Sequence, residues 1–489
     1  MSGLFYGLEI AKTGLYVSQK GLKLSGNNIA NANTEGYTRQ RLVIESLYPS
    51  TMSRFNIGIR LGGGANVKQI DQIRSAYIDR QLRGQYSALG EWNTRSTEME
   101  FIISMIDETS DTTSLSSALA SFYDSLSKLA ENPESLEIRT NVQQNATKLC
   151  ETFNYYYNQL VDQQNAYNDS MQVTVNSINS LTKSIADYNK QIFGYELSGQ
   201  SANELRDQRA LLVDKLSQLV NIEYSENENG QLTITTNGQT LVSNNDATLL
   251  ATDPDAATGF FDILYEGADF SYNSGELEAY RTLRDGTTVD DMGIPYLLSN
   301  LNTLAQSLAQ SFNEVHETGY TIPIGAGTSR TGVQFFNVPT VGGYAAITAG
   351  NIALSADVLA DGKNIAASDA PIDLNAEDTG IGNYKIAQKL YGLTTSKTIA
   401  DIGSFDDYLS SFVVQVGIAC SSAQDMSESQ TSIVDNLETR RESISGVSID
   451  DEMINLLSFQ HSYAAAARVL TAIDEAIGIL INNTGRVGL

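Results

Sequence analysis

Residues 4–33, LFYGLEIAKTGLYVSQKGLKLSGNNIANAN, carry an apolar repeat that ends in a cluster of amides. Apolar and small residues follow one another at alternating steps of four and three, which is the spacing of one stripe along an α-helix. We therefore predict a helix that packs this stripe against a partner. The members of the predicted stripe are Leu4, Leu8, Ala11, Leu15, Ser18, Leu22, Ser25 and Ile29.

Four asparagines lie within seven positions at the end of this repeat. Asparagine side chains compete for backbone hydrogen bonds and weaken helix interiors, so the helix is predicted to end near Asn33, before the extended segment 37–45. We expect Asn28, Asn31 and Asn33 both to end the helix and to bond neighbouring chains. A purely local cap, with no role between chains, is the alternative.

The C-terminal segment shows the same kind of pattern. Ser448 can cap a helix whose first turn carries three acidic residues, where the helix dipole favours negative charge. Residues 1–33 carry three lysines less one glutamate, and residues 447–489 carry two arginines less five acids, so the two helices could also attract each other weakly. The predicted apolar stripe, which slips by one residue after position 470, consists of Met453, Leu456, Gln460, Tyr463, Ala467, Leu470, Ile473, Ile477 and Leu480.

The order of patterns along the chain predicts a multidomain α+β protein. Residues 71–220 have the spacing of long helices, with one apolar stripe from Leu115 to Leu129 that is predicted to stop at Pro133 and another from Val142 to Leu160. The period changes to two at residue 221, where Asn229–Gly230 and Asn237–Gly238 are predicted hairpin turns, and helices return near residue 377. The chain would thus be nested, with both termini at one end. The predicted units are an inner terminal-helix domain (1–33 and 447–489), a helical rod domain (34–220, 275–318 and 377–446) and a β-rich outer domain (221–274 and 319–376).

The bulk properties exclude several classes of partner. With 31 basic and 58 acidic side chains the net charge is −27, which opposes binding to nucleic acid or to anionic membranes. The N-terminus lacks the apolar core of a cleaved signal peptide, and the apolar run 476–481 is too short to span a bilayer. Cys150 and Cys420 are far apart in sequence, and the sequence leaves open whether they are free or bonded.

No pattern of catalytic or metal-binding residues is present in the sequence. Of the two histidines, His316 lacks the second histidine of a zinc-protease motif and His461 lies among alanines, so we interpret both as structural. The glycines of the loop 325–332 have the wrong spacing for a phosphate cradle, and the loop 373–380 has an aspartate where a calcium loop needs glycine. We predict a protein that is not an enzyme and uses no metal or cofactor.

The two ends of the chain resemble one known family. NNIANANT at 27–34 is similar to the N-terminal signature of flagellar axial proteins, which build the rod, the hook and the hook–filament junction. SIDDEMINLLSFQHSYAAAARVLTAIDE at 448–475 resembles the closing helix of the same family. The similarity is strongest to the hook-associated members at the hook–filament junction, through the segments 7–15, 33–42, 203–224, 275–285 and 301–320.

This resemblance implies a structural subunit that is exported through the flagellar channel without a cleaved signal peptide and that becomes part of the extracellular flagellum. The implied partners are further copies of the chain, the hook protein, the second hook–filament junction protein and an export chaperone. A hook or distal-rod subunit is the alternative within the family, although such subunits tend to carry phenylalanine where Tyr37 stands. A surface adhesin that uses the β-rich region is the alternative from another class.

Overall fold

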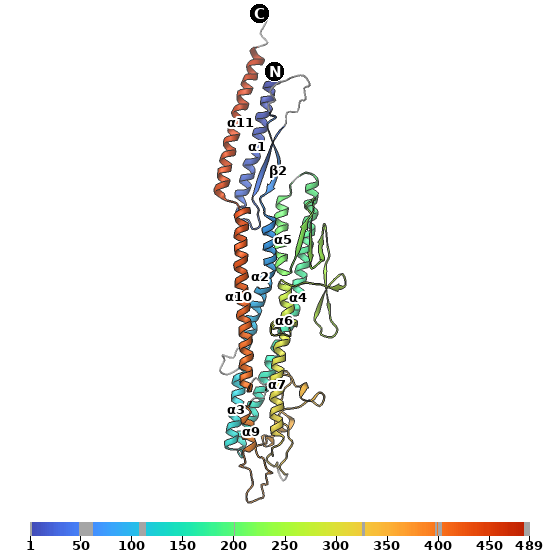
Figure 1. Cartoon of the computed structure of the whole chain (residues 1–489), viewed down its shortest axis with the longest axis vertical. Coiled ribbons are helices and arrows are strands. Elements are labelled where there is room, and N and C mark those ends of the chain that lie inside the picture. The colour runs from blue at the N-terminus through green and yellow to red at the C-terminus, as the bar shows by residue number, and fades with distance from the viewer. Residues whose placement is uncertain are drawn as a thin grey trace.

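The computed structural model describes residues 2–47, 62–106, 114–199, 201–324, 328–396, 399 and 403–483. The molecule is elongated, and both termini lie at the same end (Figure 1). Helices α1 (Ser2–Ala30) and α11 (Ile449–Asn483) lie side by side at that end. We call them the terminal helix pair. Next along the molecule come α2 (Ala76–Met105) and α10 (Phe405–Ser445), which also lie side by side.

The remaining helices form the body of the molecule with α2 and α10. They are α3 (Leu115–Glu131), α4 (Leu136–Leu197), α5 (Asn203–Leu219), α6 (Glu276–Asp285), α7 (Ile294–His316), α8 (Ala356–Ala360), α9 (Lys385–Gly392) and the short 3-10 helices η1 (Gly343–Ala346) and η2 (Gly362–Asn364). The helix break predicted at Pro133 is present, because α3 ends at Glu131 and α4 starts at Leu136. Ser135 caps the new helix by accepting a hydrogen bond from the Ile138 N–H.

The largest apolar core lies at the end of the body far from the termini. It joins α3, α7, α9 and the first half of α4, and the stripe predicted between Val142 and Leu160 is buried in it. The segment 319–376 packs into the same core through side chains such as Phe335, Phe336 and Ile365. These contacts hold several helices and the irregular segment around a common apolar centre.

The prediction that 319–376 belongs to a β-rich unit is wrong. Among its described residues the strand pairing is limited to isolated bridges, such as Tyr320 with Ser368 and Phe336 with Leu354. Short helices and turns fill the rest. Apolar residues that alternate with polar ones also suit an irregular segment draped over a helical core, and the sequence pattern cannot separate this from a strand.

The strands between residues 221 and 274 are present as predicted. One sheet has the order β3 (Glu223–Glu226), β4 (Leu232–Thr236), β5 (Gln239–Ser243) and β6 (Asp246–Ala247), and a second has the order β7 (Leu250–Pro254), β8 (Phe261–Tyr265) and β9 (Ala268–Asp269). All neighbours are antiparallel. Asn237 and Gly238, both with positive φ, form the predicted two-residue turn between β4 and β5.

These two sheets share a core with α4 and α5 rather than forming an independent domain. Val213 and Leu216 of α5 and Ile178 of α4 pack with Ile234 and Leu241 of the sheet. Small sheets of short strands need such a helical surface to bury one face. The α+β class is therefore confirmed, with helices as the dominant element.

A row of asparagines on α4 fastens the strands by their backbones. Asn179 donates to the Leu250 carbonyl and accepts from its N–H, at 2.8 Å each, and Asn189 bonds in the same way with Leu232. Asn168 accepts from the Phe261 N–H at 2.8 Å. The spacing of 11 and 10 residues is about three helical turns, so all three amides face the sheets.

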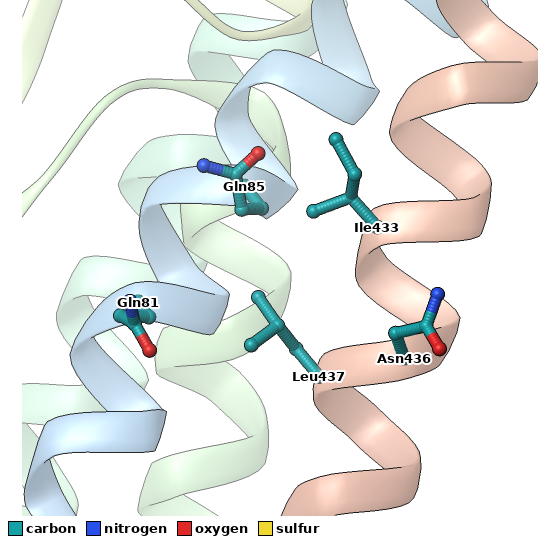
Figure 2. A pocket seen from close by; sticks show the side chains of 5 residues that line it. All are labelled: Gln81, Gln85, Ile433, Asn436 and Leu437. Atoms are coloured by element: carbon teal, nitrogen blue, oxygen red, sulfur yellow. The ribbon is translucent and has the colours of Figure 1, made fainter.

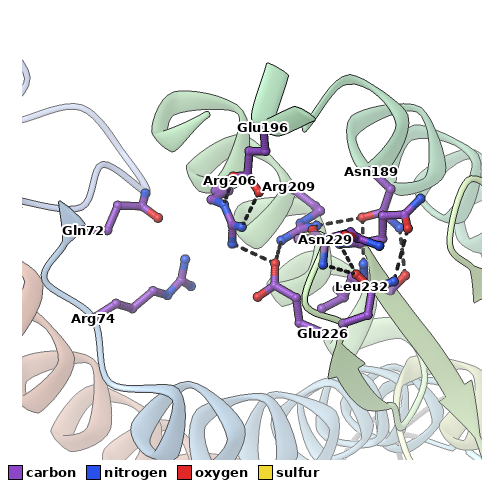
Figure 3. Close-up of polar contacts among 12 residues, drawn as sticks. Gln72, Arg74, Asn189, Glu196, Arg206, Arg209, Glu226, Asn229 and Leu232 are labelled. Atoms are coloured by element: carbon purple, nitrogen blue, oxygen red, sulfur yellow. Dashed lines mark hydrogen bonds and ion pairs between the residues drawn. The ribbon is translucent and has the colours of Figure 1, made fainter. Parts of the chain in front are cut away.

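Figure 3 shows a polar cluster that closes the same contact at the end of α4. Arg206 of α5 pairs with Glu196 of α4 and with Glu226 of β3, each at 2.7 Å. Arg209 pairs with the same Glu226 and also donates to the Asn189 amide. The strands are thus held to two helices by directional bonds as well as by apolar packing.

The hairpin of β1 (Gln40–Ser46) and β2 (Ala65–Gln72) lies beside α1 at the terminal end (Figure 1). It contacts α1 through the Thr13 hydroxyl, which accepts a hydrogen bond from the Ala65 N–H at 3.3 Å. The hairpin thereby covers one side of α1, while α11 covers another.

Candidate assembly interface

The terminal helix pair is antiparallel and meets along a row of glycines on α1. Gly7, Gly14 and Gly21 are seven residues apart, and they lie opposite Ile473, Ala466 and Phe459 of α11, which are also seven apart. The fit is tightest at Gly21, where an added Cβ would lie 2.5 Å from the Phe459 ring. Glycine therefore sets how closely the two helices approach.

The stripe predicted for α1 is only partly the face that meets α11. Ala11 is buried, while Leu8, Leu15, Leu22 and Ile29 are half-buried, and the side chain of Leu4 lies outside the described residues. The glycine row was not predicted, because counting apolar residues treats glycine as an empty position. Its strict spacing of seven is the signal that could have revealed it.

The stripe predicted for α11 divides between the helix contact and solvent. Leu456, Ala467, Leu470, Ile473 and Ile477 are half-buried. Met453 is 52% exposed, Tyr463 42% and Leu480 38%. The first group is thus partly covered within the chain, whereas the second group remains accessible to solvent.

Further large apolar side chains of the terminal helix pair are exposed, and the sequence analysis did not single them out. They occur on both helices, so large apolar side chains are exposed on the outer faces of the pair, beside charged residues such as Lys12 and Asp451. Large exposed apolar patches commonly mark a contact with another molecule. These residues are Phe5, Tyr16, Ile449, Ile454, Leu457, Val469, Ile479 and Ile481.

The asparagine cluster has a local role for two of its three predicted members. The Asn28 amide is buried and bonds with both backbone groups of Gln40 and with the Tyr37 hydroxyl. Asn31 donates to Asn27 and accepts from Thr34. The helix ends at Ala30, three residues before Asn33.

The prediction that Asn28 bonds a neighbouring chain is therefore wrong. Its amide lies 1% exposed, with its oxygen and its nitrogen both engaged inside the chain. The local alternative applies to it. Asn33 is exposed and remains a predicted contact between chains.

Two grooves lie along this end and the middle of the molecule. The first, of about 410 Å³, is lined by residues of α1 and β2 and by Tyr463 of α11. The second, of about 340 Å³, lies between Gln81 and Gln85 of α2 and Ile433, Asn436 and Leu437 of α10 (Figure 2). Amide and aliphatic groups line the second groove, so its lining offers no acid, base or nucleophile.

His316 and the loop 373–380 bond to the chain's own backbone, whereas His461 lies at the surface. His316 is fully buried, with Nδ1 2.6 Å from the Val333 carbonyl and Nε2 accepting from the Ala366 N–H, and burial lowers its pKa to about 4. His461 is exposed on α11. In the loop 373–380 the aspartates accept hydrogen bonds from the loop's own backbone, and the loop 325–332 begins outside the described residues.

Cys150 and Cys420 are free thiols buried in the main core. Burial raises the pKa of the Cys150 thiol to about 12 and also raises that of Cys420. Within the described ranges, no group of histidine, cysteine and acidic residues is arranged to hold a metal ion. Over the same ranges, no helix combines the length and apolar character that a membrane span needs.

A long chain whose ends form an exposed apolar helix pair belongs to the class of subunits that build elongated assemblies. Comparison with known families narrows this class to flagellar axial proteins. Residues 8–38 match the family model of flagella basal body rod proteins, and residues 441–483 match that of the C-terminal part of the flagellar basal body rod FlgEFG proteins.

The interior decides the family. Residues 101–336 match the family model of the helical domain of flagellar hook-associated protein FlgK. The chain is 32% identical to flagellar hook-associated protein 1 of Bacillus subtilis, over 99% of each chain, and 27% identical to that of Salmonella typhimurium, over 96% of this chain and 98% of the relative. The chain belongs to the family of flagellar hook-associated protein 1, so the predicted function as a structural flagellar protein of the hook–filament junction is confirmed.

A solved structure agrees in fold. The flagellar hook junction protein FlgK from Burkholderia pseudomallei superposes with a TM-score of 0.60 at 17% identity, and the match covers 75% of this chain and all of the other. At this identity the likeness shows the fold alone. It supports the mixed helical and sheet architecture described above.

Proposed function

We propose that this chain builds its part of the junction by self-assembly through the terminal helix pair, with residues 1–33 and 447–489 as the inner domain. The observation that carries this proposal is the exposure of large apolar side chains on both helices, including Ile454 at 64% and Ile481 at 71%. Leaving such surface in water is unfavourable by about 25 cal/mol per Å², so contact with further copies stabilises the pair. The body then projects outward from the inner layer.

The partners follow from this arrangement and from the family. A pair that lies in a continuous tube contacts copies of the same chain at its sides, the hook protein at one boundary and the second hook–filament junction protein at the other. Met453, Tyr463 and Leu480 are the predicted residues that the free chain leaves exposed for such contacts. The chain acts by binding and does not catalyse a reaction.

The route to this location is export without a cleaved signal peptide, assisted by a flagellar export chaperone, to the outside of the cell. The two buried free thiols are compatible with this route, because a chain without a disulfide can pass unfolded through a narrow channel. The net charge of −27 favours neither nucleic acid nor an anionic membrane surface as a partner.

The assembly role is tested by Met453→Asp, compared with Leu249→Asp as a control. Both residues are large, apolar and more than half exposed, but Leu249 lies in the strand region away from the terminal helix pair. Burying a carboxylate at an apolar contact costs several kcal/mol, so Met453→Asp should be secreted and folded but absent from flagella. Normal incorporation of Met453→Asp, or equal loss with Leu249→Asp, would contradict the proposed interface.

The location is tested by immunogold labelling of purified flagella. Labelling confined to the boundary between hook and filament is expected, together with completed hooks and leaked filament subunits when the gene is deleted. Labelling along the whole hook would instead identify a hook subunit. Full-length filaments in the deletion strain would remove the junction role altogether.

A further inference from the structure

The terminal helix pair is joined to the body without a shared apolar core. Three clusters of buried apolar residues occur in the described part of the chain, and none includes a residue of α1, α11 or the β1–β2 hairpin. The chain nevertheless passes this level three times, after α1, before α2 and between α10 and α11. Apolar contact between the two parts includes Leu211 of α5 beside Gly36, and the other contacts traced below are polar.

Gln40, at the start of β1, is bonded to both parts. Its N–H donates to the Asn28 side chain of α1 at 3.2 Å, and its carbonyl accepts from the same amide at 2.9 Å. Its own side chain accepts from Asn203 at 3.2 Å and donates to Glu204 at 3.3 Å, both at the start of α5. Gln40 is 5% exposed, so its backbone is fixed to the terminal helix pair and its side chain to the body.

Asp207, one turn further along α5, makes a second link. Its two carboxylate oxygens accept from the Thr38 N–H at 3.1 Å and from the Gln72 side chain at 2.8 Å. Thr38 precedes β1 and Gln72 ends β2, so this carboxylate bonds to the hairpin where the chain enters it and where the chain leaves it. Asp207 is 4% exposed, and this burial is the main cause that raises its pKa to about 6.

Arg39 makes the third link, to the opposite side. Its guanidinium donates to Glu452 of α11 at 2.9 Å, and its N–H donates to the Ser445 carbonyl at the end of α10 at 2.8 Å. Glu452 is 2% exposed. One residue thus clamps the passage from α10 to α11.

We propose that these contacts form a rigid coupling that fixes the direction of the terminal helix pair relative to the body. The coupling consists of Asn28, residues 38–40, Gln72, residues 203–207 and Glu452. Apolar surfaces tolerate sliding and rotation, whereas hydrogen bonds are directional and lose strength quickly when their geometry changes. A coupling made of buried hydrogen bonds therefore transmits rotation of the terminal helix pair to the body, so that the two parts move together as one rigid unit.

The coupling is tested by measuring the distance across it in the full chain. Spin labels are placed on cysteines introduced at the exposed residues Lys23 of α1 and Asp435 of α10. The two native thiols are buried, so they are expected to react much more slowly with the label than the introduced cysteines, and labelling of the chain without introduced cysteines checks this. Double electron–electron resonance measures the distance between the two spin labels. In the chain that carries no other substitution it should give one narrow peak.

Gln40→Met keeps the length of the side chain and removes its bonds to α5, so the peak should broaden. Gln69→Met is the matched control, since Gln69 lies exposed in the same hairpin, and it should leave the peak narrow. Amide exchange at Thr38 should also speed by about tenfold in Gln40→Met. A broad peak in the unaltered chain, or a narrow one in Gln40→Met, would overturn the proposal.

A second variant guards against a failure of Gln40→Met to fold. Asp207→Asn can accept from only one of its two donors, Thr38 or Gln72, and should broaden the same peak. Unchanged circular dichroism shows in each case that the body is intact. An Asp207→Asn chain with native dichroism and an unchanged narrow peak would also refute the coupling.

Discussion

The glycines of α1 allow a prediction of graded effects, because the space available for an added Cβ differs from one glycine to the next. An alanine Cβ at Gly21 would lie 2.5 Å from Cδ1 and Cε1 of Phe459 and 2.7 Å from Cγ, so both the ring and its attachment are in the way. At Gly14 the nearest atom, Cβ of Ala466, is 3.6 Å away, which is ordinary contact. At Gly26 nothing lies within 4 Å.

The three substitutions should therefore differ in sign. Glycine is less favourable than alanine in a helix interior by about 1 kcal/mol, so Gly26→Ala and Gly14→Ala should stabilise α1. Gly21→Ala gains the same amount but forces an overpacked contact that costs about 1–3 kcal/mol, so the helix pair should open more easily. Phe459→Leu in the Gly21→Ala background removes the ring and should restore part of the loss.

Hydrogen exchange of the α1 amides measures this directly in the full chain, because it reports local opening. We expect slower exchange in Gly26→Ala and faster exchange in Gly21→Ala than in the unaltered chain. Equal protection in Gly21→Ala and Gly26→Ala would refute the assigned contact between Gly21 and Phe459. Gly14→Ala is the control on the same face of α1. If any added Cβ on this face weakened the helix pair, Gly14→Ala would exchange as fast as Gly21→Ala.

Two further predictions concern the body. The pKa of His316 is lowered to about 4 from 6.5 because burial disfavours its charged form, so its contribution to stability is complete above pH 6.5 and is lost as the pH falls toward 4. The free energy of unfolding measured in urea should fall by about 3 kcal/mol over this pH range, and by less in His316→Gln. If the free energy of unfolding depended on pH equally in both chains, the assigned role of His316 would be disproved. Gly230→Ala should destabilise the strand region more than Gly238→Ala: both glycines have positive φ, but only at Gly230 would a Cβ meet Glu196, 2.5 Å away. Equal unfolding midpoints would refute this difference.

The helices of the body could be predicted because their stripes are long and regular. The stripe from Leu115 to Leu129 and the one from Val142 to Leu160 are buried as expected, and Pro133 separates them. Ser448 also caps α11 as predicted, by accepting from the Asp451 N–H. In each case a local rule, periodicity, proline or capping, is enough.

What could not be predicted depends on contacts between distant segments. The asparagines at 168, 179 and 189 look like ordinary polar residues of a long helix until the strands are placed beside them. The pattern of 319–376 predicts strands, but alternation alone does not say whether a neighbouring strand is available, and the segment forms only isolated bridges in its described residues. Gln40 likewise gives no sign in the sequence that its four polar groups face in two directions.

The division of contacts also explains why the ends and the middle of the chain resemble different sets of proteins. In the proposed assembly, subunits of different kinds would meet in one continuous inner layer and would need a similar apolar helix surface, which accounts for the match of residues 8–38 and 441–483 to rod proteins. The three apolar clusters lie in the body, and none of them includes a residue of the terminal helix pair. Under the same proposal the fold of the body could differ from one kind of subunit to another, which agrees with the match of residues 101–336 to the helical domain of FlgK. The proposed polar coupling would let a shared inner surface set the direction of a body that differs between kinds of subunit.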